Sequence, residues 1–499
     1  MSPSVTPKHF LGPGPAGVTS VAVRSRRRRA AALLAALAMA GATGMPCNSR
    51  AEAGDPGTES APEARPAALP EPSLAAPPEP SSPPSHWPQL VGAQYTFVRQ
   101  HQTELTSPSE GPRSLDPTGD TQSSHTIGVY LGWAVFDRLQ LYLDTEKFMG
   151  AGVSGAQGLG GLPNGDVVRQ GSGNLPKRFY VARKFVRYLI PLPFGGTKTV
   201  ERAQDQLPGS EPAARVEIKA GVLAANDDFD QNRYANSTRT QFMNWSLWNN
   251  TAWDFAADTR GYTEGAVVGF ITPRWSVKYG LYEMPVRANQ QQLESSIRRA
   301  RGENLELTYD ADGTIVRVLA YRNIARMGVY TDAIAVAQAT GTVPDIVAQD
   351  RQGRRKLGFG LNVEQPLADD GDTGVFARAG WNDGKTESFA FTEVDRTFTF
   401  GGQLAGGRWK RGEDRLALAV AVNGLSEPHR QYLEDGGVGF LLGDGRLKYG
   451  PEETLETYYR FQFGHYVQLS PDLQYVRSPG YNRDRGPVSI YGVRLHLEY

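Results

Sequence analysis

The sequence contains little cysteine, which removes several kinds of chemistry from consideration. Its 499 residues include one cysteine, Cys47. This residue lies in an N-terminal segment that we expect to be cleaved on export, so the exported chain would hold none. Disulfides, zinc–thiolate sites and thiol nucleophiles are then excluded, although export would have permitted disulfides.

Long hydrophobic runs and common catalytic motifs are also missing. No continuous apolar run after residue 53 is long enough for a helix that crosses a bilayer. The seven histidines form neither an H-x-H nor an H-E-x-x-H pattern, so nothing supports a zinc site. Neither a nucleophile elbow nor a phosphate loop occurs. We therefore expect a protein that is not an enzyme and that needs no metal and no cofactor.

The first 53 residues have the features of a Sec-type signal peptide. Five arginines between Arg24 and Arg29 form a positive region, an apolar run follows at 30–42, and Ala51-Glu52-Ala53 is a cleavage motif. The apolar run is short for an anchor in a bilayer of ~30 Å. Cleavage near Ala53 would leave 46 basic and 52 acidic residues, a net charge of −6. This charge argues against a partner such as nucleic acid.

Residues 54–88 are rich in proline, alanine, glutamate and serine. This composition predicts a disordered, polyproline-like leader. After export the leader would lie in the periplasm. Two interpretations stay open: a tether that reaches peptidoglycan, and a tail without a specific partner.

From residue 89 to residue 499 the recurring pattern is alternation of apolar and polar residues with a period of two. It extends over about ten residues at a time, the length of a tilted β-strand that crosses a bilayer. The polar face carries full charges and glycines in strand after strand, as a water-filled lumen permits. The last strand alternates most clearly, with Tyr491, Val493, Leu495 and Leu497 on one face and Gly492, Arg494, His496 and Glu498 on the other.

This pattern predicts an all-β fold, a transmembrane antiparallel β-barrel of about sixteen strands with long extracellular loops and a few short loop helices. An even number of strands places both termini in the periplasm. Short helices are expected at 287–301 and 330–340. The expected strands are 92–100, 124–135, 138–147, 177–190, 214–224, 265–272, 274–284, 303–310, 314–324, 355–365, 373–381, 395–406, 414–424, 454–464, 465–477 and 487–498.

Two segments depart from the simple pattern. The strand at 177–190 alternates poorly, because Arg183 and Arg187 share a face with Phe179 and Phe185. The tripeptide 483–485, Arg-Asp-Arg, precedes the last strand. We expect it to form a periplasmic turn in which arginine–carboxylate pairs close the barrel.

Several ordered motifs resemble the carbohydrate-selective porin family (OprB type) of Gram-negative bacteria. The strongest is Gly480-Tyr481-Asn482-Arg483-Asp484-Arg485-Gly486-Pro487-Val488, followed by Arg494-Leu495-His496 and a terminal aromatic. The terminal Tyr499, where Phe is usual, and the proline-rich leader depart from the family pattern. Further matches are the run 429–445, Tyr449, Glu452, Glu456, Tyr458, Tyr459, 236–241, Trp253-Asp254, 257–263, 320–323 and Met327-Gly328.

The resemblance covers roughly residues 90–499 and implies a passive channel in the outer membrane. Such a channel is a sixteen-stranded barrel, narrowed by inward loops, that passes monosaccharides and small oligosaccharides. Expected partners are these sugars, outer-membrane lipid, and the barrel assembly machinery through the terminal strand 488–499. The sequence leaves monomer and homotrimer open.

Sugar passage needs polar groups and flat aromatic faces that bind weakly. Such groups are dense between Asp227 and Arg260, and we expect part of this stretch to fold inward. The alternative is that its tryptophans sit in an interfacial belt or a loop core and its charges face solvent. The candidate constriction residues are Asp228, Arg233, Asn236, Arg239, Asn244, Trp245, Asn249, Asn250, Trp253, Asp254, Asp258 and Arg260.

Two sharper hypotheses about local chemistry fail. The run 228–232 begins like a calcium loop, but Arg239 stands where the closing Glu belongs. Glu452 and Glu456 could suggest paired carboxylates for glycoside hydrolysis, yet a charged lumen wall explains them. The competing functions are a general diffusion porin, an exporter or adhesin barrel, and a secreted β-rich enzyme that acts on polysaccharides.

Overall fold

The computed structural model describes residues 87–167, 175, 177–389 and 392–499. The chain divides into residues 1–78 and residues 79–499. The first unit and the remainder of the leader up to residue 86, including the predicted signal peptide, lie outside the described residues. None of the described helices is long and apolar enough to cross a membrane.

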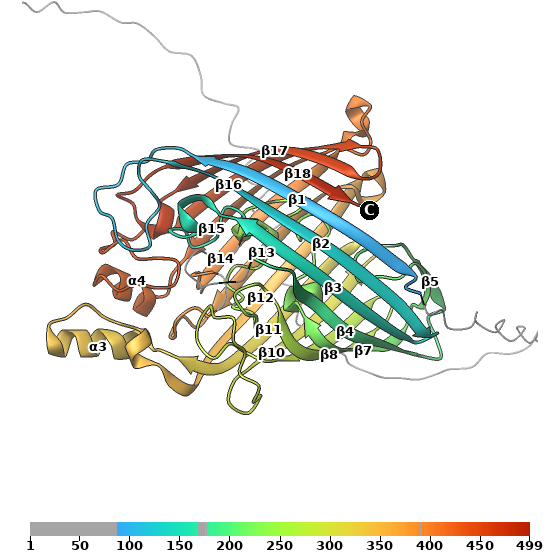
Figure 1. Cartoon of the computed structure of the whole chain (residues 1–499), viewed down its shortest axis with the longest axis horizontal. Coiled ribbons are helices and arrows are strands. Elements are labelled where there is room, and N and C mark those ends of the chain that lie inside the picture. Colours follow the sequence, from blue (N-terminus) through green and yellow to red (C-terminus); the bar gives the residue numbers. More distant parts are fainter. Residues whose placement is uncertain (1–86, 168–174, 176, 390–391) are drawn as a thin grey trace, which may run out of the picture. The chain divides into compact units, whose positions relative to one another are not determined.

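Sixteen strands close into a single antiparallel barrel, in which β1 pairs with β18 and the others pair with their sequence neighbours in the wall (Figure 1). The predicted all-β barrel and its strand number are confirmed. The short hairpin of β5 (Thr197–Val200) and β6 (Gly209–Pro212) lies between β4 and β7 and is not part of the wall. The wall strands are β1 (Leu90–Gln102), β2 (Asp120–Phe136), β3 (Leu139–Gly150), β4 (Tyr180–Pro191), β7 (Arg215–Leu223), β8 (Thr263–Ile271), β9 (Trp275–Tyr282), β10 (Arg301–Ala311), β11 (Thr314–Met327), β12 (Arg351–Ala368), β13 (Thr373–Asn382), β14 (Arg396–Ala405), β15 (Arg415–Gly424), β16 (Glu452–Phe463), β17 (Val467–Arg477) and β18 (Val488–Glu498).

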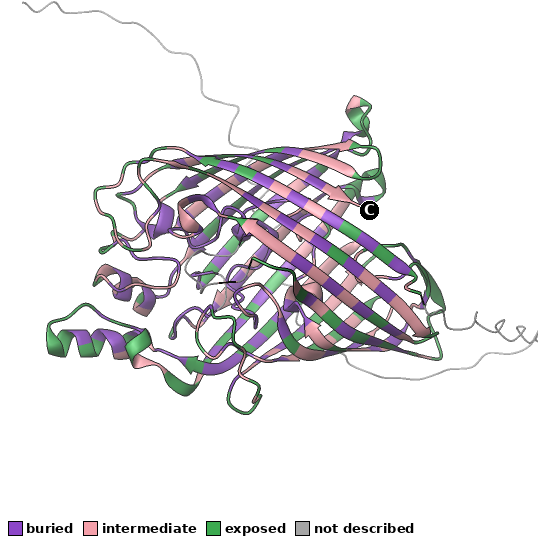
Figure 2. Cartoon of the chain, in the orientation of Figure 1, coloured by how far each residue is buried: buried purple, intermediate pink, exposed green. Residues whose placement is uncertain are grey.

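The strands alternate between exposed and buried residues, as the sequence pattern requires (Figure 2). In β15 and β12 the outward residues are large and apolar, such as Leu418, 53 % exposed, and Phe359, 54 % exposed. The inward residues are polar, charged or small, such as Asn362 and Glu364. An apolar outer surface around a polar interior is the arrangement of a barrel that spans a membrane.

The two ends of the barrel differ. The long segments that join the strands, such as 224–262 and 425–451, leave from one end, which we call the loop end. Short connections and the strand termini at Leu90 and Glu498 occupy the other, which we call the turn end (Figure 1). Helices α3 (Tyr330–Thr340) and α4 (Glu427–Glu434) lie at the loop end.

The predicted helix at 330–340 is confirmed by α3, whereas the predicted helix at 287–301 is wrong. This segment is an irregular loop, in which Asn289 has a left-handed φ of 53° and Leu293 forms a β-bridge with Pro285, just before the segment. The Asn289 N–H donates to Phe389 O at 2.8 Å. The Glu294 N–H donates to Met284 O at 2.9 Å, so a residue outside the segment accepts from a backbone donor that a helix would have used.

The expected position of residues 483–485 is also wrong. Strand β18 begins at Val488 on the loop end and finishes at Glu498 on the turn end, so this tripeptide lies among the long loops. Arg485 donates there to the carbonyls of Ser109 and Leu115, at 2.6 and 2.9 Å. Arg485 also lies 3.5 Å from Asp444, so an arginine–carboxylate pair forms as expected, but it joins loops at the opposite end of the barrel.

A buried histidine joins three of the loops at this end. His429 of α4 lies 2.9 Å from Asp395 Oδ2 through its Nδ1, and its ring stacks on Tyr330 of α3 at a centroid distance of 4.4 Å. Burial alone would lower the pKa of His429, but the carboxylates of Asp395 and Glu393 raise it to about 9. The charged imidazolium therefore stabilises the fold fully below its ordinary pKa of 6.5, and this contribution is lost as the pH rises through about 9.

We predict that His429→Gln lowers the free energy of unfolding by about 2 kcal/mol at pH 7, because Asp395 loses a charged partner. The difference from the wild type should shrink by pH 10, where the native histidine is itself neutral. Urea titrations of the refolded barrel at both pH values measure it. The exposed His465→Gln serves as the control. An equal difference at pH 7 and pH 10 would contradict the assignment.

Candidate pore constriction

The segment between β7 and β8, residues 224–262, enters the barrel instead of staying at the loop end. It starts beside Leu223 and descends far enough for the Tyr234 hydroxyl to donate to Gly371 O at 2.9 Å. Gly371 belongs to the turn between β12 and β13, at the opposite end of the barrel. The segment then returns through the short helix α2 (Trp245–Trp248). We call residues 224–262 the inward loop.

Two buried ion pairs join the inward loop to the barrel wall. Arg378 of β13 lies 3.0 Å from Asp230, and Lys356 of β12 lies 2.9 Å from Asp254. All four side chains are at most 4 % exposed. Arg378 also donates to the carbonyl of Ala235 at 2.7 Å. Charges that leave water in this way are tolerated because each has a partner of opposite sign.

Further wall residues bind the backbone of the inward loop. Glu456 of β16 accepts hydrogen bonds from the N–H groups of Met243 and Asn244, at 2.6 and 2.9 Å. Arg494 of β18 donates to the carbonyls of Thr238 and Gln241, at 2.7 and 2.6 Å. Strands on widely separated parts of the wall thus fix one loop across the lumen.

A second segment, the described part of the loop that follows β3, packs against the inward loop. Trp245 N–H donates to Leu162 O at 2.8 Å, and Gly165 N–H donates to Met243 O at 2.8 Å. Gln100 of β1 and Gln474 of β17 both donate to Pro163 O. The lumen is therefore narrowed by two loops that support each other.

A cavity of about 480 Å³ remains between these loops and one side of the barrel wall. Its wall is formed by strands β2, β3, β4 and β7, and its opposite side by the inward loop. Its charged and aromatic lining residues are Glu146, Phe148, Asp166, Tyr180, Arg183, Phe185, Asp205, Lys219, Asp227, Asp228, Arg239, Trp245, Trp248, Phe255, Arg260 and Tyr262.

Most of the charges that line this cavity neutralise each other. Arg183 makes two hydrogen bonds to Asp227, at 2.6 and 2.8 Å. Lys219 lies 2.7 Å from Asp228, and Arg239 lies 2.8 Å from both Glu146 and Asp166. The cavity is thus polar without being strongly charged.

Arg260 is held in another way. Its guanidinium lies 4.1 Å from the centroid of the Tyr180 ring, a cation–π contact. The turn that presents it is shaped by Asp258, whose carboxylate accepts the N–H groups of Arg260 and Tyr262 at 2.8 and 3.1 Å. Burial raises the pKa of Asp258 to about 6, against the opposing effect of these hydrogen bonds.

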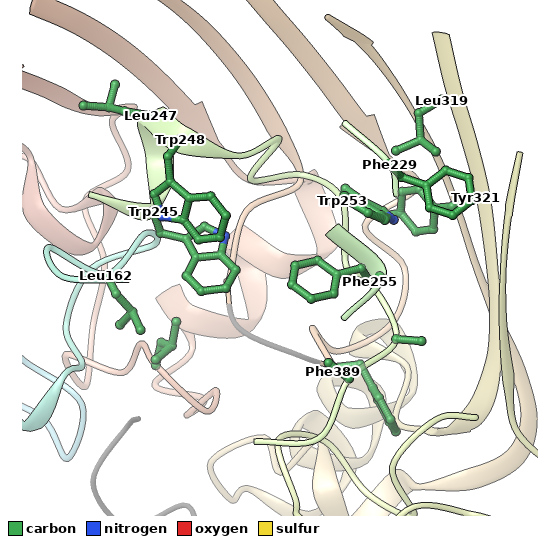
Figure 3. Close-up of a cluster of buried hydrophobic side chains, with 14 of the residues drawn as sticks. Leu162, Phe229, Trp245, Leu247, Trp248, Trp253, Phe255, Leu319, Tyr321 and Phe389 are labelled. Atoms are coloured by element: carbon green, nitrogen blue, oxygen red, sulfur yellow. The ribbon is translucent and has the colours of Figure 1, made fainter. Parts of the chain in front are cut away.

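Aromatic side chains of the inward loop gather beside one another (Figure 3), and three of them line the cavity. The rings of Trp245 and Trp248 lie 4.8 Å apart, and Phe255 stacks on Trp245 at 6.0 Å. Several buried polar atoms among the lining residues have no hydrogen-bond partner within the described part of the chain. They are Thr126 Oγ1, Asp205 Oδ1, Asp228 Oδ2, Trp248 Nε1 and Thr259 Oγ1.

The structure separates the predicted constriction residues into two groups. Five line the cavity: Asp228, Asn236, Arg239, Trp245 and Arg260. The other seven do not: Arg233, Asn244, Asn249, Asn250, Trp253, Asp254 and Asp258. Several of these shape or attach the loop, as Trp253 does by packing against Phe229 and donating to Asn304 Oδ1 at 3.1 Å (Figure 3).

Sequence reasoning missed lining residues that come from the wall, above all Arg183. The sequence did contain a sign of this, because the strand at 177–190, which holds Arg183, alternates poorly. Val181 pairs with Thr145 and Arg183 pairs with Asp144, so Ala182 is an unpaired bulge residue. The bulge turns Arg183 inward while Phe179 stays exposed, and it re-aims a side chain as bulges near functional sites often do.

A family model for the carbohydrate-selective porins of the OprB family matches residues 115–499. The chain belongs to this family. It is a carbohydrate-selective channel of the outer membrane, and its fold is that of a channel rather than of an enzyme. A search of curated protein sequences finds no match.

One solved structure shares the fold of this chain. The high-pH structure of Pseudomonas putida OprB matches with a TM-score of 0.60 at 14 % identity, over 82 % of this chain and 94 % of that chain. The in-vitro folded trimer of Vibrio cholerae OmpT matches with a TM-score of 0.41 at 9 % identity, over 82 % and 99 % of the two chains.

We predict that Arg378→Met lowers the free energy of unfolding of this porin by about 3–5 kcal/mol, because Asp230 keeps a buried charge without its partner. The double variant with Asp230→Asn should recover part of the loss. The matched control is Arg274→Met, because Arg274 pairs with Asp312 where both side chains are more than half exposed. That change should cost about 1 kcal/mol or less. Equal costs for both arginines would show that the inward loop does not depend on the Arg378 pair.

Proposed function

We propose that neutral monosaccharides and small oligosaccharides diffuse passively through the cavity between the inward loop and strands β2, β3, β4 and β7. The observation that supports this most directly is the mutual neutralisation of the lining charges, in pairs such as Arg239 with Glu146 and Lys219 with Asp228. Paired charges offer hydrogen bonds while they create little field that would attract ions or repel neutral solutes.

The unpartnered polar atoms support weak sugar binding. Hydroxyl groups both donate and accept, so they can satisfy the Trp248 indole N–H, the free oxygen of Asp228 and the hydroxyl of Thr259. An apolar sugar face can lie against the nearby aromatic rings. Each net hydrogen bond contributes only about 1 kcal/mol, and weak contacts allow the solute to leave again.

A general diffusion porin is the competing function within the same class. Such a pore needs no saturable site, whereas this cavity gathers aromatic faces and unpaired polar atoms in one place. Hydrolysis of sugars is less well supported. The two glutamates that could suggest it, Glu452 and Glu456, accept backbone N–H groups of the loops, including those of Gly480 and Asn244.

The route to the membrane is part of the same proposal. Residues 1–53 would be removed near Ala53, and residues 54–88 would form a periplasmic leader. The assembly machinery would recognise strand 488–499. The subunit would function as a monomer or a homotrimer.

We predict that glucose partially blocks the ion current of single channels in planar bilayers, in a saturable way. Trp248→Ala and Arg260→Ala should each raise the half-blocking glucose concentration about five-fold, the effect of losing about 1 kcal/mol of binding. The control is Arg408→Ala, at an exposed position in the turn after β14. A current that no sugar reduces would leave only a general pore.

A further inference from the structure

The connection between β4 and β7 is unusually long for the turn end of the barrel. It spans residues 192–214, holds the β5–β6 hairpin, and lies at the same end of the barrel as the C-terminus (Figure 1). The segment between the two hairpin strands turns back into the lumen. We call residues 201–207 the floor segment.

The floor segment reaches deep into the barrel. Gln204 donates to Asp144 of β3 at 2.6 Å and accepts from Gln94 of β1 at 3.2 Å. Asp205 lies 3.3 Å from Arg183, which is near the loop end of β4. Leu207 is buried, and its N–H donates to the Tyr142 hydroxyl at 3.2 Å.

One arginine fixes the floor segment to the place where the barrel closes. Arg202 donates to Val91 O of β1 at 2.7 Å. Its guanidinium lies 5.8 Å from the Tyr130 ring of β2 and 5.9 Å from the ring of Tyr499, the last residue. Because β1 and β18 pair at this seam, the segment is held by both ends of the barrel sheet.

Buried charges hold the other side of the connection. Glu211 of β6 accepts a hydrogen bond from Arg187 of β4 at 3.0 Å and lies 3.8 Å from Arg215 of β7. These side chains are at most 9 % exposed. A turn that simply projected into solvent would not need buried partners of this kind.

The floor segment narrows the cavity toward the turn end. Gln204, Asp205 and Gln206 line the same cavity as Arg260 and Trp248. One carboxylate oxygen of Asp205 is buried and has no hydrogen-bond partner among the residues that the structure describes. An amide and a carboxyl group suit the hydroxyls of a neutral polyol, because together they donate and accept.

We propose that the floor segment is a specificity-determining part of the solute site, in which Gln204 and Asp205 bind sugar hydroxyls on the exit side. The contacts of Arg202 hold the segment in place, and its position limits the size of solute that passes. This inference rests on the proposed function. It assigns the turn-end constriction to a connection between strands, whereas the inward loop forms the other side.

The test compares three variants of the full-length porin in planar bilayers: Gln204→Ala, Arg202→Gln and Thr199→Ala. Gln204→Ala removes a lining group and should raise the half-blocking glucose concentration several-fold. Arg202 does not line the cavity, so Arg202→Gln changes the pore only by loosening the contacts that hold the floor segment in place. It should raise the conductance of the unblocked channel and admit maltotriose faster in liposome-swelling assays. Thr199→Ala, in the exposed part of β5, is the control.

Conductance, swelling rate and glucose block that equal the Thr199→Ala values in both other variants would overturn the inference. If Arg202→Gln does not fold, the glucose block of Gln204→Ala decides alone. If no sugar blocks the wild-type channel, the proposed function fails, and with it the sugar contacts of Gln204. In that case an increased conductance of Arg202→Gln still establishes the floor segment as a constriction. An unchanged conductance would show that the floor segment does not constrict the pore.

Discussion

The buried ion pairs between the inward loop and the barrel wall determine most of what this porin can do. A sixteen-stranded barrel by itself encloses a wide, polar lumen. Asp230 with Arg378 and Asp254 with Lys356 place a long segment across that lumen. A buried charge without its partner is strongly destabilising, so the loop has one favoured position, in which both ion pairs form.

The position of the loop decides the chemistry of the remaining space. With one side of the lumen filled, the open cavity lies against β2, β3, β4 and β7, where the charges of the wall meet those of the loop. Arg239 of the loop pairs with Glu146 of the wall, and Asp228 of the loop pairs with Lys219. One set of ion pairs between loop and wall thus fixes the loop, and a second set neutralises the cavity, which suits an uncharged, hydroxyl-rich solute.

The barrel could be predicted from the sequence because the alternation within each strand shows which residues face the lipid and which face the lumen. Alternation located the strands and their number, and the prediction of α3 at 330–340 was confirmed. The prediction of a helix at 287–301 was wrong, because Asn289 has a left-handed φ and the Glu294 N–H donates to Met284, outside the segment. Composition led us to expect that part of 227–260 folds inward, but it could not separate Trp248, which lines the cavity, from Trp253, which anchors the loop. That difference depends on which strand each indole meets.

The wall side of the cavity was harder to predict for another physical reason. The bulge at Ala182 shifts the register of one strand by one residue, and this moves Arg183 to the lumen. The floor segment gave no signal, because a polar turn has the same composition whether it projects into solvent or folds back into a barrel. Its role depends on Arg202, Tyr130 and Tyr499 meeting at the seam.

The most direct test of the central claim labels introduced cysteines, because the exported chain is expected to contain none of its own. Ser237→Cys, in a Cys47→Ser background, places a thiol in the cavity lining, and Thr340→Cys places one on the exposed end of α3. A charged methanethiosulfonate reagent is added to single channels during recording. If the cavity beside the inward loop is the path of conduction, the current of Ser237→Cys falls in a step when the thiol reacts, while that of Thr340→Cys is unchanged. Full labelling of Ser237→Cys with an unaltered current would contradict the account.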